Sequence, residues 1–367
     1  MAGLYIHIPF CASRCIYCGF YSTTLNGFRD KYIDAICKEM KMRGDQAINT
    51  IYIGGGTPSQ LSKEELDKIF LFIKKTYDIS DLKEITIECN PDDITPELAK
   101  TIASHANRIS MGAQTFSDKR LKFLHRRHNA EEVRTAVKNF RIAGIKNISI
   151  DLMFGFPDET LDEWNTDIKN AIALNIEHIS AYSLMYEEGT ALYKMLKQNK
   201  IRQITDEQSF NMYDLLIDKL KSAGFEHYEI SNFAKPGFRS IHNSSYWQGI
   251  PYIGIGAAAH SFDINTRSWN VANLQEYINT INKGQNPSEK EIIDEITEYN
   301  DLIVTALRTK DGICLTNLKD KYKNYLITNA RRFINGGMMQ IKNNHLSFKR
   351  KGLYISDSIM RDLIYII

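Results

Sequence analysis

Nowhere does the 367-residue sequence contain an apolar run near the ~20 residues that a membrane-spanning helix needs. Its first four residues, Met1 to Leu4, lack the basic stretch and long apolar segment that mark a secretory signal. Cysteine is also scarce. Three of the six cysteines, Cys37, Cys89 and Cys314, are scattered, which does not resemble a disulfide framework and fits a reducing compartment. We expect a soluble cytoplasmic protein, with peripheral attachment to a membrane left open.

The sequence has almost no net charge, +2 in total, but the charge is unevenly distributed. Residues 301–367 carry 12 Lys and Arg against 5 Asp and Glu, a net charge of +7, so the rest of the chain is at about −5. With 43% hydrophobic and 25% charged residues, the chain can bury a sizeable core. The length predicts one large domain and a smaller one.

Six strand-like runs, each followed by a helical pattern, fill the first 225 residues. The runs are residues 4–8, 50–53, 84–88, 108–111, 147–153 and 178–182. Such a series predicts parallel strands joined by right-handed crossovers, in an open sheet or a barrel. Polar residues follow nearly every run, and a barrel gathers all its strand ends around one mouth. We therefore predict an α/β fold with a partial (β/α)6 barrel similar to a TIM barrel.

Two further regions follow the predicted barrel of residues 1–225. Residues 226–290 are rich in glycine and aromatic residues, and we expect them to close the open side of the barrel. Residues 291–367 predict a helix over 291–307, two short helices within 316–333 and a hairpin on an Asn-Asn turn. This pattern is typical of a small winged-helix-like domain. Such domains often bind DNA, but basic charge on a solvated face is commoner, so we expect no specific nucleic-acid partner.

Three closely spaced cysteines follow the first strand-like run. Cys11, Cys15 and Cys18 have the spacing C-x3-C-x2-C, and a loop around a soft metal centre can turn all three thiolates inward. Zinc sites usually pair two C-x2-C units to reach four ligands. Three thiols without an evident fourth favour a 4Fe-4S cluster with one iron left open, although the spacing alone leaves zinc as an alternative.

Other candidate residues lie at the ends of the following runs. One such group is Gly54, Gly55, Gly56 and Thr57, which does not match a Walker A or G-x-G-x-x-G motif. Its glycines either form a flexible turn or allow the backbone to approach a ligand closely. Glu88 and Asp151 each lie in an apolar run. Either carboxylate alone could form a structural salt bridge, but their position on successive strand ends favours a binding site.

The segment Tyr5-Ile6-His7-Ile8-Pro9-Phe10-Cys11, leading into the cysteine spacing, resembles radical S-adenosylmethionine (SAM) enzymes of the oxygen-independent coproporphyrinogen III oxidase family. The resemblance covers most of the chain. It implies that Cys11, Cys15 and Cys18 hold three irons of the cluster and that SAM chelates the fourth. It also assigns SAM binding to Tyr5, Gly54, Gly55, Gly56, Thr57, Glu88, Gln114, Arg126 and Asp151.

One residue departs from the oxidases of this family. Many of them carry a further cysteine two positions after the third, where this chain has Phe20. The pattern is similar to the HemW branch, whose members are understood as haem chaperones. The motif His242-Asn243-Ser244-Ser245-Tyr246-Trp247 also matches this branch and implies haem contacts from His242, Tyr246 and Trp247. Without the resemblance, His242 would be interpreted as a packed loop residue, and we interpret His260 as a satisfied structural histidine.

The resemblance implies a haem chaperone that binds haem and a SAM-coordinated 4Fe-4S cluster and passes haem to an acceptor protein. The alternative is an oxygen-independent coproporphyrinogen III oxidase, which uses radical SAM chemistry to decarboxylate two propionates. Phe20, the haem motif and the expected absence of an N-terminal extension favour the chaperone. A radical SAM enzyme with another substrate is a third alternative. The expected partners are haem and an acceptor, which could be membrane-associated, and homodimer formation is left open.

Overall fold

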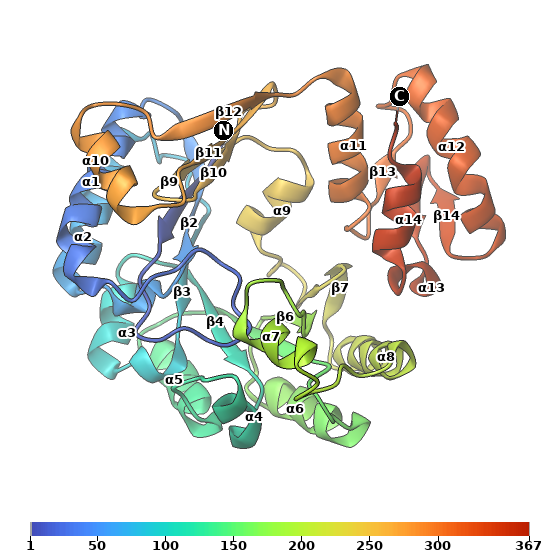
Figure 1. The fold of residues 1–367 in the computed structure, drawn as a ribbon, viewed down its shortest axis with the longest axis horizontal. Helices are drawn as coiled ribbons and strands as arrows, with labels where there is room; N and C mark the ends of the chain where they lie inside the picture. Colours follow the sequence, from blue (N-terminus) through green and yellow to red (C-terminus); the bar gives the residue numbers. More distant parts are fainter. Residues whose placement is uncertain (1, 367) are drawn as a thin grey trace.

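The computed structural model describes residues 2–366 and contains one large mixed sheet, covered by helices, and a separate C-terminal lobe (Figure 1). The strands of the large sheet are β1 (Ala2–Ile8), β2 (Ile48–Gly55), β3 (Glu84–Cys89), β4 (Arg108–Gln114), β5 (Asn147–Phe154), β6 (His178–Ser183), β7 (Glu226–Glu229), β8 (Asn232–Ala234), β9 (Tyr252–Ile255), β10 (His260–Phe262), β11 (Thr266–Asn270) and β12 (Ser288–Ile292). The helices associated with it are α1 (Arg29–Met42), α2 (Lys63–Thr76), α3 (Pro96–Ala103), α4 (Asp118–Phe123), α5 (Ala130–Ile142), α6 (Leu161–Ala173), α7 (Ala191–Lys197), α8 (Asp206–Ser222), α9 (Ile241–Trp247) and α10 (Leu274–Asn282).

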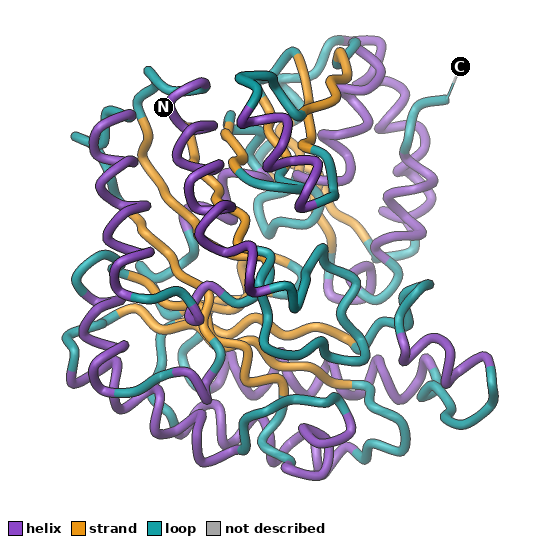
Figure 2. The backbone as a smooth tube through the Cα atoms, turned by 60° about the vertical axis from the view of Figure 1, so that its left-hand side comes forward, coloured by secondary structure: helices purple, strands orange, loops and turns teal. Residues whose placement is uncertain are grey.

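Strands β1 to β6 are parallel and lie side by side in sequence order, with helices packed on their outer face (Figure 2). The strand-helix alternation predicted from the sequence is therefore confirmed. Helix starts follow from their caps: Ser62 and Glu65 form the capping box expected at the start of α2. The apolar faces of the helices pack on the sheet in one continuous core.

Residues 226–290 extend this sheet at both edges. β8 and β7 add antiparallel strands beyond β6, while β9 pairs in parallel with β1 and continues into β10, β11 and β12. In the described part of the chain, no strand pairing joins β7 to β12, so the sheet stays open between these edges. The region thus lengthens the sheet, and the expectation that it closes the open side of the barrel stays a prediction.

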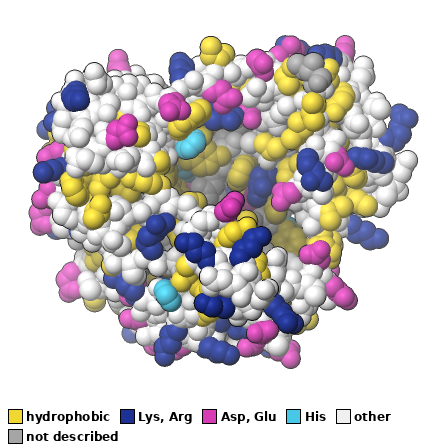
Figure 3. Space-filling view, in the orientation of Figure 1, with side chains coloured by type: hydrophobic (Ala, Val, Ile, Leu, Met, Phe, Trp, Pro, Cys, Tyr) yellow, Lys and Arg dark blue, Asp and Glu magenta, His cyan; other side chains and the backbone are white. Residues whose placement is uncertain are grey.

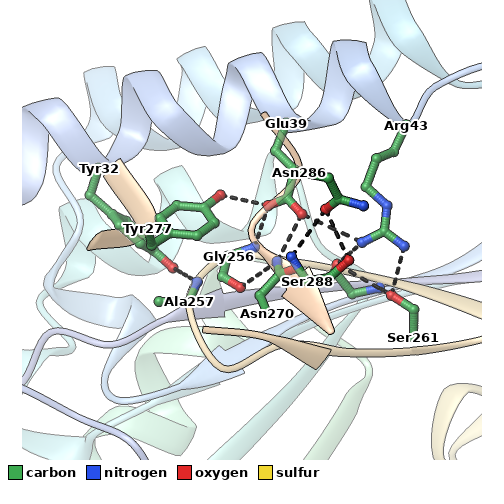
Figure 4. Close-up of polar contacts among 11 residues, drawn as sticks. Tyr32, Glu39, Arg43, Gly256, Ala257, Ser261, Asn270, Tyr277, Asn286 and Ser288 are labelled. Atoms are coloured by element: carbon green, nitrogen blue, oxygen red, sulfur yellow. Dashed lines mark hydrogen bonds and ion pairs between the residues drawn. The ribbon is translucent and has the colours of Figure 1, made fainter. Parts of the chain in front are cut away.

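A buried polar network fixes the added strands to helix α1 (Figure 4). The carboxylate of Glu39, which is 1% exposed, accepts hydrogen bonds from the Tyr277 hydroxyl at 2.5 Å, the Gly256 amide at 2.8 Å and the Asn270 amide at 2.8 Å. Arg43 contacts the same carboxylate at 3.4 Å. Several donors surround this buried charge, so its burial is compensated and the β9–β10 turn is held at a defined place.

The C-terminal lobe has its own apolar core, separate from that of the sheet. It contains α11 (Glu295–Ala306), β13 (Ile313–Cys314), α12 (Asp320–Asn335), β14 (Met339–Lys342), β15 (His345–Phe348), α13 (Arg350–Leu353) and α14 (Ser356–Leu363). The predicted hairpin is present, with Asn343 and Asn344 at φ values of 51° and 61° in its turn. Its classification as winged-helix-like stays a prediction, as do the domain bounds, whose residues 1 and 367 lie outside the described part.

Two helix predictions for this lobe were inaccurate. The helix expected from residue 291 begins at Glu295, because residues 288–292 form strand β12 on the edge of the large sheet. The two short helices expected within 316–333 are one helix, α12, whose Tyr322, Leu326 and Ala330 are buried at helical spacing. Across residues 2–366, no helix is long and apolar enough to span a bilayer.

Candidate functional site

The cysteine loop leaves the end of β1 and is anchored on both sides. Phe10 is fully buried, and the Cys11 amide donates to the Thr23 carbonyl at 2.9 Å. Further along, Ile16 packs in a small apolar cluster, and its amide donates to the Leu124 carbonyl at 3.2 Å. These anchors hold the residues between them at the carboxyl ends of the barrel strands, where TIM-like folds keep their chemistry.

All three cysteines of the loop are free and partly exposed, so their thiols are accessible. Thr57 Oγ1 donates to Cys11 Sγ at 3.3 Å, and Arg126 Nη1 donates to Cys15 Sγ at 3.6 Å. Burial raises the pKa of Cys11 and that of Cys18. A cationic neighbour and a hydroxyl donor both stabilise thiolate, which is the form that binds iron.

The three thiols of the loop are compatible with an iron-sulfur cluster. Each thiolate of a 4Fe-4S cluster binds a different iron, so its three sulfurs need not meet at one point. The role of these cysteines as ligands of a cluster with one open iron stays a prediction.

The glycine motif lies beside the cysteine loop, where neighbouring groups leave no space for side chains. A Cβ at Gly54 would lie 2.8 Å from the Glu88 carboxyl carbon, and a Cβ at Gly56 would lie 2.6 Å from the Pro9 carbonyl carbon. Gly55 has φ = 111°, a conformation that favours glycine. Close packing between strands accounts for these glycines, and it also brings the backbone to the edge of the site.

Two partly buried carboxylates, Glu88 of β3 and Asp151 of β5, lie next to this motif. Glu88 accepts hydrogen bonds from the Tyr52 hydroxyl at 2.7 Å and from the Gly55 amide at 2.9 Å, while burial raises its pKa. Burial, followed by the nearby Glu88 charge, raises the pKa of Asp151 to about 7. Asp151 can therefore both donate and accept hydrogen bonds near neutral pH, which suits contact with sugar hydroxyls.

Arg126 and Gln114 complete the set of side chains predicted to bind SAM. Arg126 Nη2 donates to the Asn90 side chain and to the Gly112 carbonyl, each at 2.7 Å, while its buried Nε has no partner in the described structure. Gln114 adopts φ = 65°, a left-handed conformation at the end of β4. An unsatisfied guanidinium donor next to the cysteines fits a ligand that carries a carboxylate.

Helix α9, which carries the predicted haem motif, packs against strand β2 of the sheet. Glu84 of β3 accepts hydrogen bonds from the backbone amides of Ile241 and His242 and from the Ser240 hydroxyl. A carboxylate at the amino end of a helix satisfies its free amides and its dipole. The motif is thus fixed to the start of β3 and is not a mobile loop.

His242 is 1% exposed and uses both ring nitrogens within the protein. Its Nδ1 is hydrogen-bonded to Thr50 Oγ1 at 2.9 Å and its Nε2 to the Tyr246 hydroxyl at 2.8 Å. Its ring also stacks on Tyr52, and burial lowers its pKa to about 3. His242 does not line a cavity in the described structure, so its contact with haem stays a prediction.

A hollow of about 1220 Å³ lies between the sheet and the C-terminal lobe (Figure 3). Its volume exceeds the ~300–1000 Å³ of ordinary small-molecule sites. Its walls come from strand β1, the cysteine loop, helix α9, the β9–β11 edge and the lobe. Aromatic and aliphatic residues dominate them, among them Phe20, Tyr21, Tyr246, Trp247, Tyr252, Phe262, Ile264, Tyr299, Leu302, Val304, Leu318 and Tyr322.

The structure distributes the predicted residues over two adjoining places. The cysteines, the glycine motif, Glu88, Arg126 and Asp151 surround the strand ends. Tyr246 and Trp247 line the hollow, and so does Tyr5, which the sequence analysis assigned to SAM. Phe20 is 72% exposed and belongs to both, because it follows the cysteines and also lines the hollow.

Several wall residues were not predicted. His7, His260 and side chains of α11 and α12 line the hollow, but they come from segments far apart in the chain. For His260, the sequence signal is the density of aromatic residues between 225 and 270. The interpretation of His260 as a satisfied structural histidine is wrong, because this side chain is exposed and forms no hydrogen bond within residues 2–366.

Comparison with known proteins agrees with this arrangement. Residues 5–171 match the radical SAM superfamily. The heme chaperone HemW of Lactococcus lactis is 34% identical over 325 residues, which cover 87% of this chain and 84% of that protein. The chain belongs to the HemW family. The heme chaperone HemW of Bacillus subtilis is 37% identical, with coverage of 88% and 87%.

Among solved structures, the coproporphyrinogen III oxidase HemN from Escherichia coli, described as a radical SAM enzyme, has the same fold. Its TM-score is 0.85 at 20% identity, over 100% of this chain and 90% of that one. The predicted TIM-like radical SAM fold is therefore confirmed for this HemW family member. Membership of the superfamily implies a 4Fe-4S cluster and SAM as cofactors.

Proposed function

We propose that this protein is a haem chaperone that binds haem in the hollow between the sheet and the C-terminal lobe and passes it to an acceptor protein. The hollow carries the proposal: it is large enough for a tetrapyrrole, and its walls are mostly aromatic and aliphatic. A flat apolar macrocycle gains from burial against such walls. The names of the HemW relatives, with most of both chains covered, support the same function.

Two aromatic residues of the α9 motif support a haem-binding wall. Tyr246 is oriented by its bond to His242, and the Trp247 ring lies 5.2 Å beneath the Arg308 guanidinium of the lobe. The buried Trp247 Nε1 has no acceptor in the described residues. We propose that this N–H is available to a propionate oxygen of haem, since a buried donor gains from a charged acceptor.

The SAM site adjoins the proposed haem site. We propose that Cys11, Cys15 and Cys18 hold the cluster, and that Gly54 to Thr57, Glu88, Gln114, Arg126 and Asp151 bind SAM. When bound, the cluster and SAM supply one-electron chemistry. Arg126 is placed to bind the carboxylate of SAM, and Glu88 keeps the glycine turn in place by accepting the Gly55 amide. Tyr5 contacts His7 and faces the hollow, so we place it between the two sites.

The alternative function, coproporphyrinogen III oxidation, draws support from the HemN fold alone. Phe20 stands where many oxidases of the family have a fourth cysteine, and here it forms part of the apolar wall. We propose that its ring contacts porphyrin. Several expectations stay predictions: the acceptor and its association with a membrane, the formation of a homodimer, and a cytoplasmic or peripheral location.

An anaerobic experiment separates the two functions. The full chain is reconstituted with iron and sulfide, then divided. One half is mixed with SAM, reductant and coproporphyrinogen III and assayed for decarboxylation. The other is titrated with haem and passed through a desalting column. We expect retained haem and no decarboxylation. Robust decarboxylation without retained haem would contradict the chaperone proposal, and loss of the cluster in a Cys15→Ala control would show that the loop holds it.

A further inference from the structure

We propose that the imidazole of His260, on strand β10, is the axial ligand of the haem iron in the hollow. This assignment rests on the proposed haem-binding function and identifies the side chain that would coordinate the haem iron. His260 lines the hollow and is exposed at its wall. Figure 3 shows the hollow with apolar side chains around it.

The first argument is that the other histidines of this region have no nitrogen available. His7 lines the same hollow, but its Nδ1 is bonded to the Tyr5 hydroxyl and its Nε2 to the Tyr21 carbonyl, each at 2.9 Å. The His242 ring is likewise bonded through both nitrogens. In contrast, neither nitrogen of His260 has a hydrogen-bond partner in the described part of the chain. Coordination at His260 breaks no existing bond.

The second argument is that the backbone around His260 is held rigidly. The turn before it contains Gly256 at φ = 107° and Ala258 at φ = 59°, and the latter is unusual for a residue with a Cβ. Behind the turn, the Glu39 network of Figure 4 binds the Gly256 amide and Asn270. After His260, the Ser261 hydroxyl accepts from Arg43 at 2.9 Å and from the Gly254 amide at 2.9 Å.

This network is larger than an ordinary turn requires. The Glu39 carboxylate, Arg43 and the Tyr32 hydroxyl all bond to residues 254–261, the segment that carries His260 to the wall of the hollow. The Tyr32 hydroxyl, for example, accepts from the Ala257 amide at 3.0 Å. Binding sites keep their geometry when the residues behind the ligand are themselves fixed. We therefore assign the network the role of positioning His260.

The chemistry is a simple ligand exchange. A lone pair on a neutral imidazole nitrogen forms a bond to haem iron and displaces water, with no change in oxidation state. Burial lowers the pKa of His260, so the ring is neutral at pH 7 and its lone pair is available. The apolar residues nearby, Tyr252, Phe262 and Ile264, can lie against the porphyrin faces.

Cys314 is the competing ligand. It lies on β13 of the C-terminal lobe and also lines the hollow, and hydrogen bonds from Thr316 lower its pKa. A thiolate also binds haem iron. However, the Cys314 sulfur is already within 3.1 Å of the Thr316 hydroxyl. Its backbone is held by pairing with His345 of β15, so the test must distinguish the two ligands.

The test compares haem binding by the full chain and its His260→Ala, Cys314→Ser and His345→Ala variants. His345 is paired with Cys314 in the C-terminal lobe but does not line the hollow, so it controls for loss of any histidine. Haem affinity is measured by titration, and the axial ligand is read from the Soret spectrum, electron paramagnetic resonance and resonance Raman scattering. Cluster content and melting temperature are recorded for every variant.

We expect His260→Ala to weaken haem binding at least about tenfold and to lose the imidazole signature, with unchanged cluster content and melting temperature. Free imidazole should restore that signature in this variant. Cys314→Ser and His345→Ala should behave as the unaltered chain. An unchanged spectrum and affinity in His260→Ala, or a loss confined to Cys314→Ser, would overturn the assignment while leaving the chaperone proposal intact. Absence of haem binding by the unaltered chain would instead overturn the chaperone proposal itself.

Discussion

At the scale of single residues, His242 and His260 differ in burial and in hydrogen bonding. His242 is buried and satisfied, and its ring fits against Gly3, where a Cβ would lie 3.1 Å from the ring. His260 is exposed and unsatisfied in the described structure. A sequence motif indicates that a histidine belongs to a functional region. Only its contacts show whether both ring nitrogens are hydrogen-bonded within the protein or whether one is available to a ligand.

This contrast gives a prediction about stability. His242→Ala removes two buried hydrogen bonds and leaves Thr50 and Tyr246 without partners beside a new cavity. We expect the free energy of unfolding to fall by about 2–4 kcal/mol. His260→Ala, at an exposed position without hydrogen bonds, should change it by less than about 0.5 kcal/mol.

Urea unfolding followed by circular dichroism measures both values. Haem affinity of His242→Ala should also fall, because Tyr246 loses its orienting partner, while cluster content stays the same. Equal destabilisation by the two substitutions would contradict the distinction between them.

At the scale of secondary structure elements, helix α9 depends on a residue far away in the sequence. Three donors at its amino end converge on Glu84, and Tyr228 contributes a hydroxyl 3.4 Å from the Ser240 amide. A helix of seven residues is not stable on its own in water. Its conformation therefore relies on this anchor.

Replacing the anchor should loosen the helix. Glu84→Ala leaves the Ile241 and His242 amides buried without acceptors, and we expect it to destabilise the fold by about 2–4 kcal/mol. Hydrogen exchange should accelerate in α9 before it does in β1 to β6. Glu64→Ala, an exposed carboxylate in the first turn of α2, is the matched control and should cost less than about 1 kcal/mol. Unchanged exchange in α9 would show that other contacts hold it.

The local features of these elements were predicted from the sequence better than the pairing of each element with its neighbours in the fold. The β-α alternation and the Asn343-Asn344 turn depend on residues close to each other in the sequence, and both are present. The pairing of β9 with β1 depends on backbone bonds between segments about 250 residues apart, which no local pattern encodes. For the same reason, the cysteine spacing indicated the cluster loop, but nothing indicated that α11 and α12 share a hollow with it.

At the scale of the whole molecule, ion pairs and backbone hydrogen bonds join the C-terminal lobe to the part of the chain that forms the large sheet. Arg308 pairs with Glu229 at 3.3 Å, and its carbonyl accepts from the Ile230 amide at 3.0 Å. Arg267 of β11 pairs with Asp301 of α11, and Arg350 pairs with Asp214 at 2.5 Å. A ligand that fills the hollow between the two parts would add further contact between them.

Haem should thus slow hydrogen exchange on both sides of the hollow. We expect protection in α9, in the β9–β11 edge and in α11 and α12, and none in α13 or α14, which lie away from it. Exchange measured by mass spectrometry with and without haem tests this, and zinc protoporphyrin serves as a second probe. Protection limited to the barrel mouth would place the porphyrin at the SAM site instead.

The parallel pairing of β9 with β1 also has a consequence for the order of events during synthesis. β1 carries the cysteine loop and has β2 on one side, but its other neighbour begins only at Tyr252. At about 5–20 residues per second, a ribosome needs roughly ten to fifty seconds to make the intervening chain. Throughout that interval, β1 is an edge strand with unpaired backbone groups beside three reactive thiols. The nascent chain is most vulnerable to aggregation and oxidation then, and the loop is braced for its cluster only after strand β9 has docked.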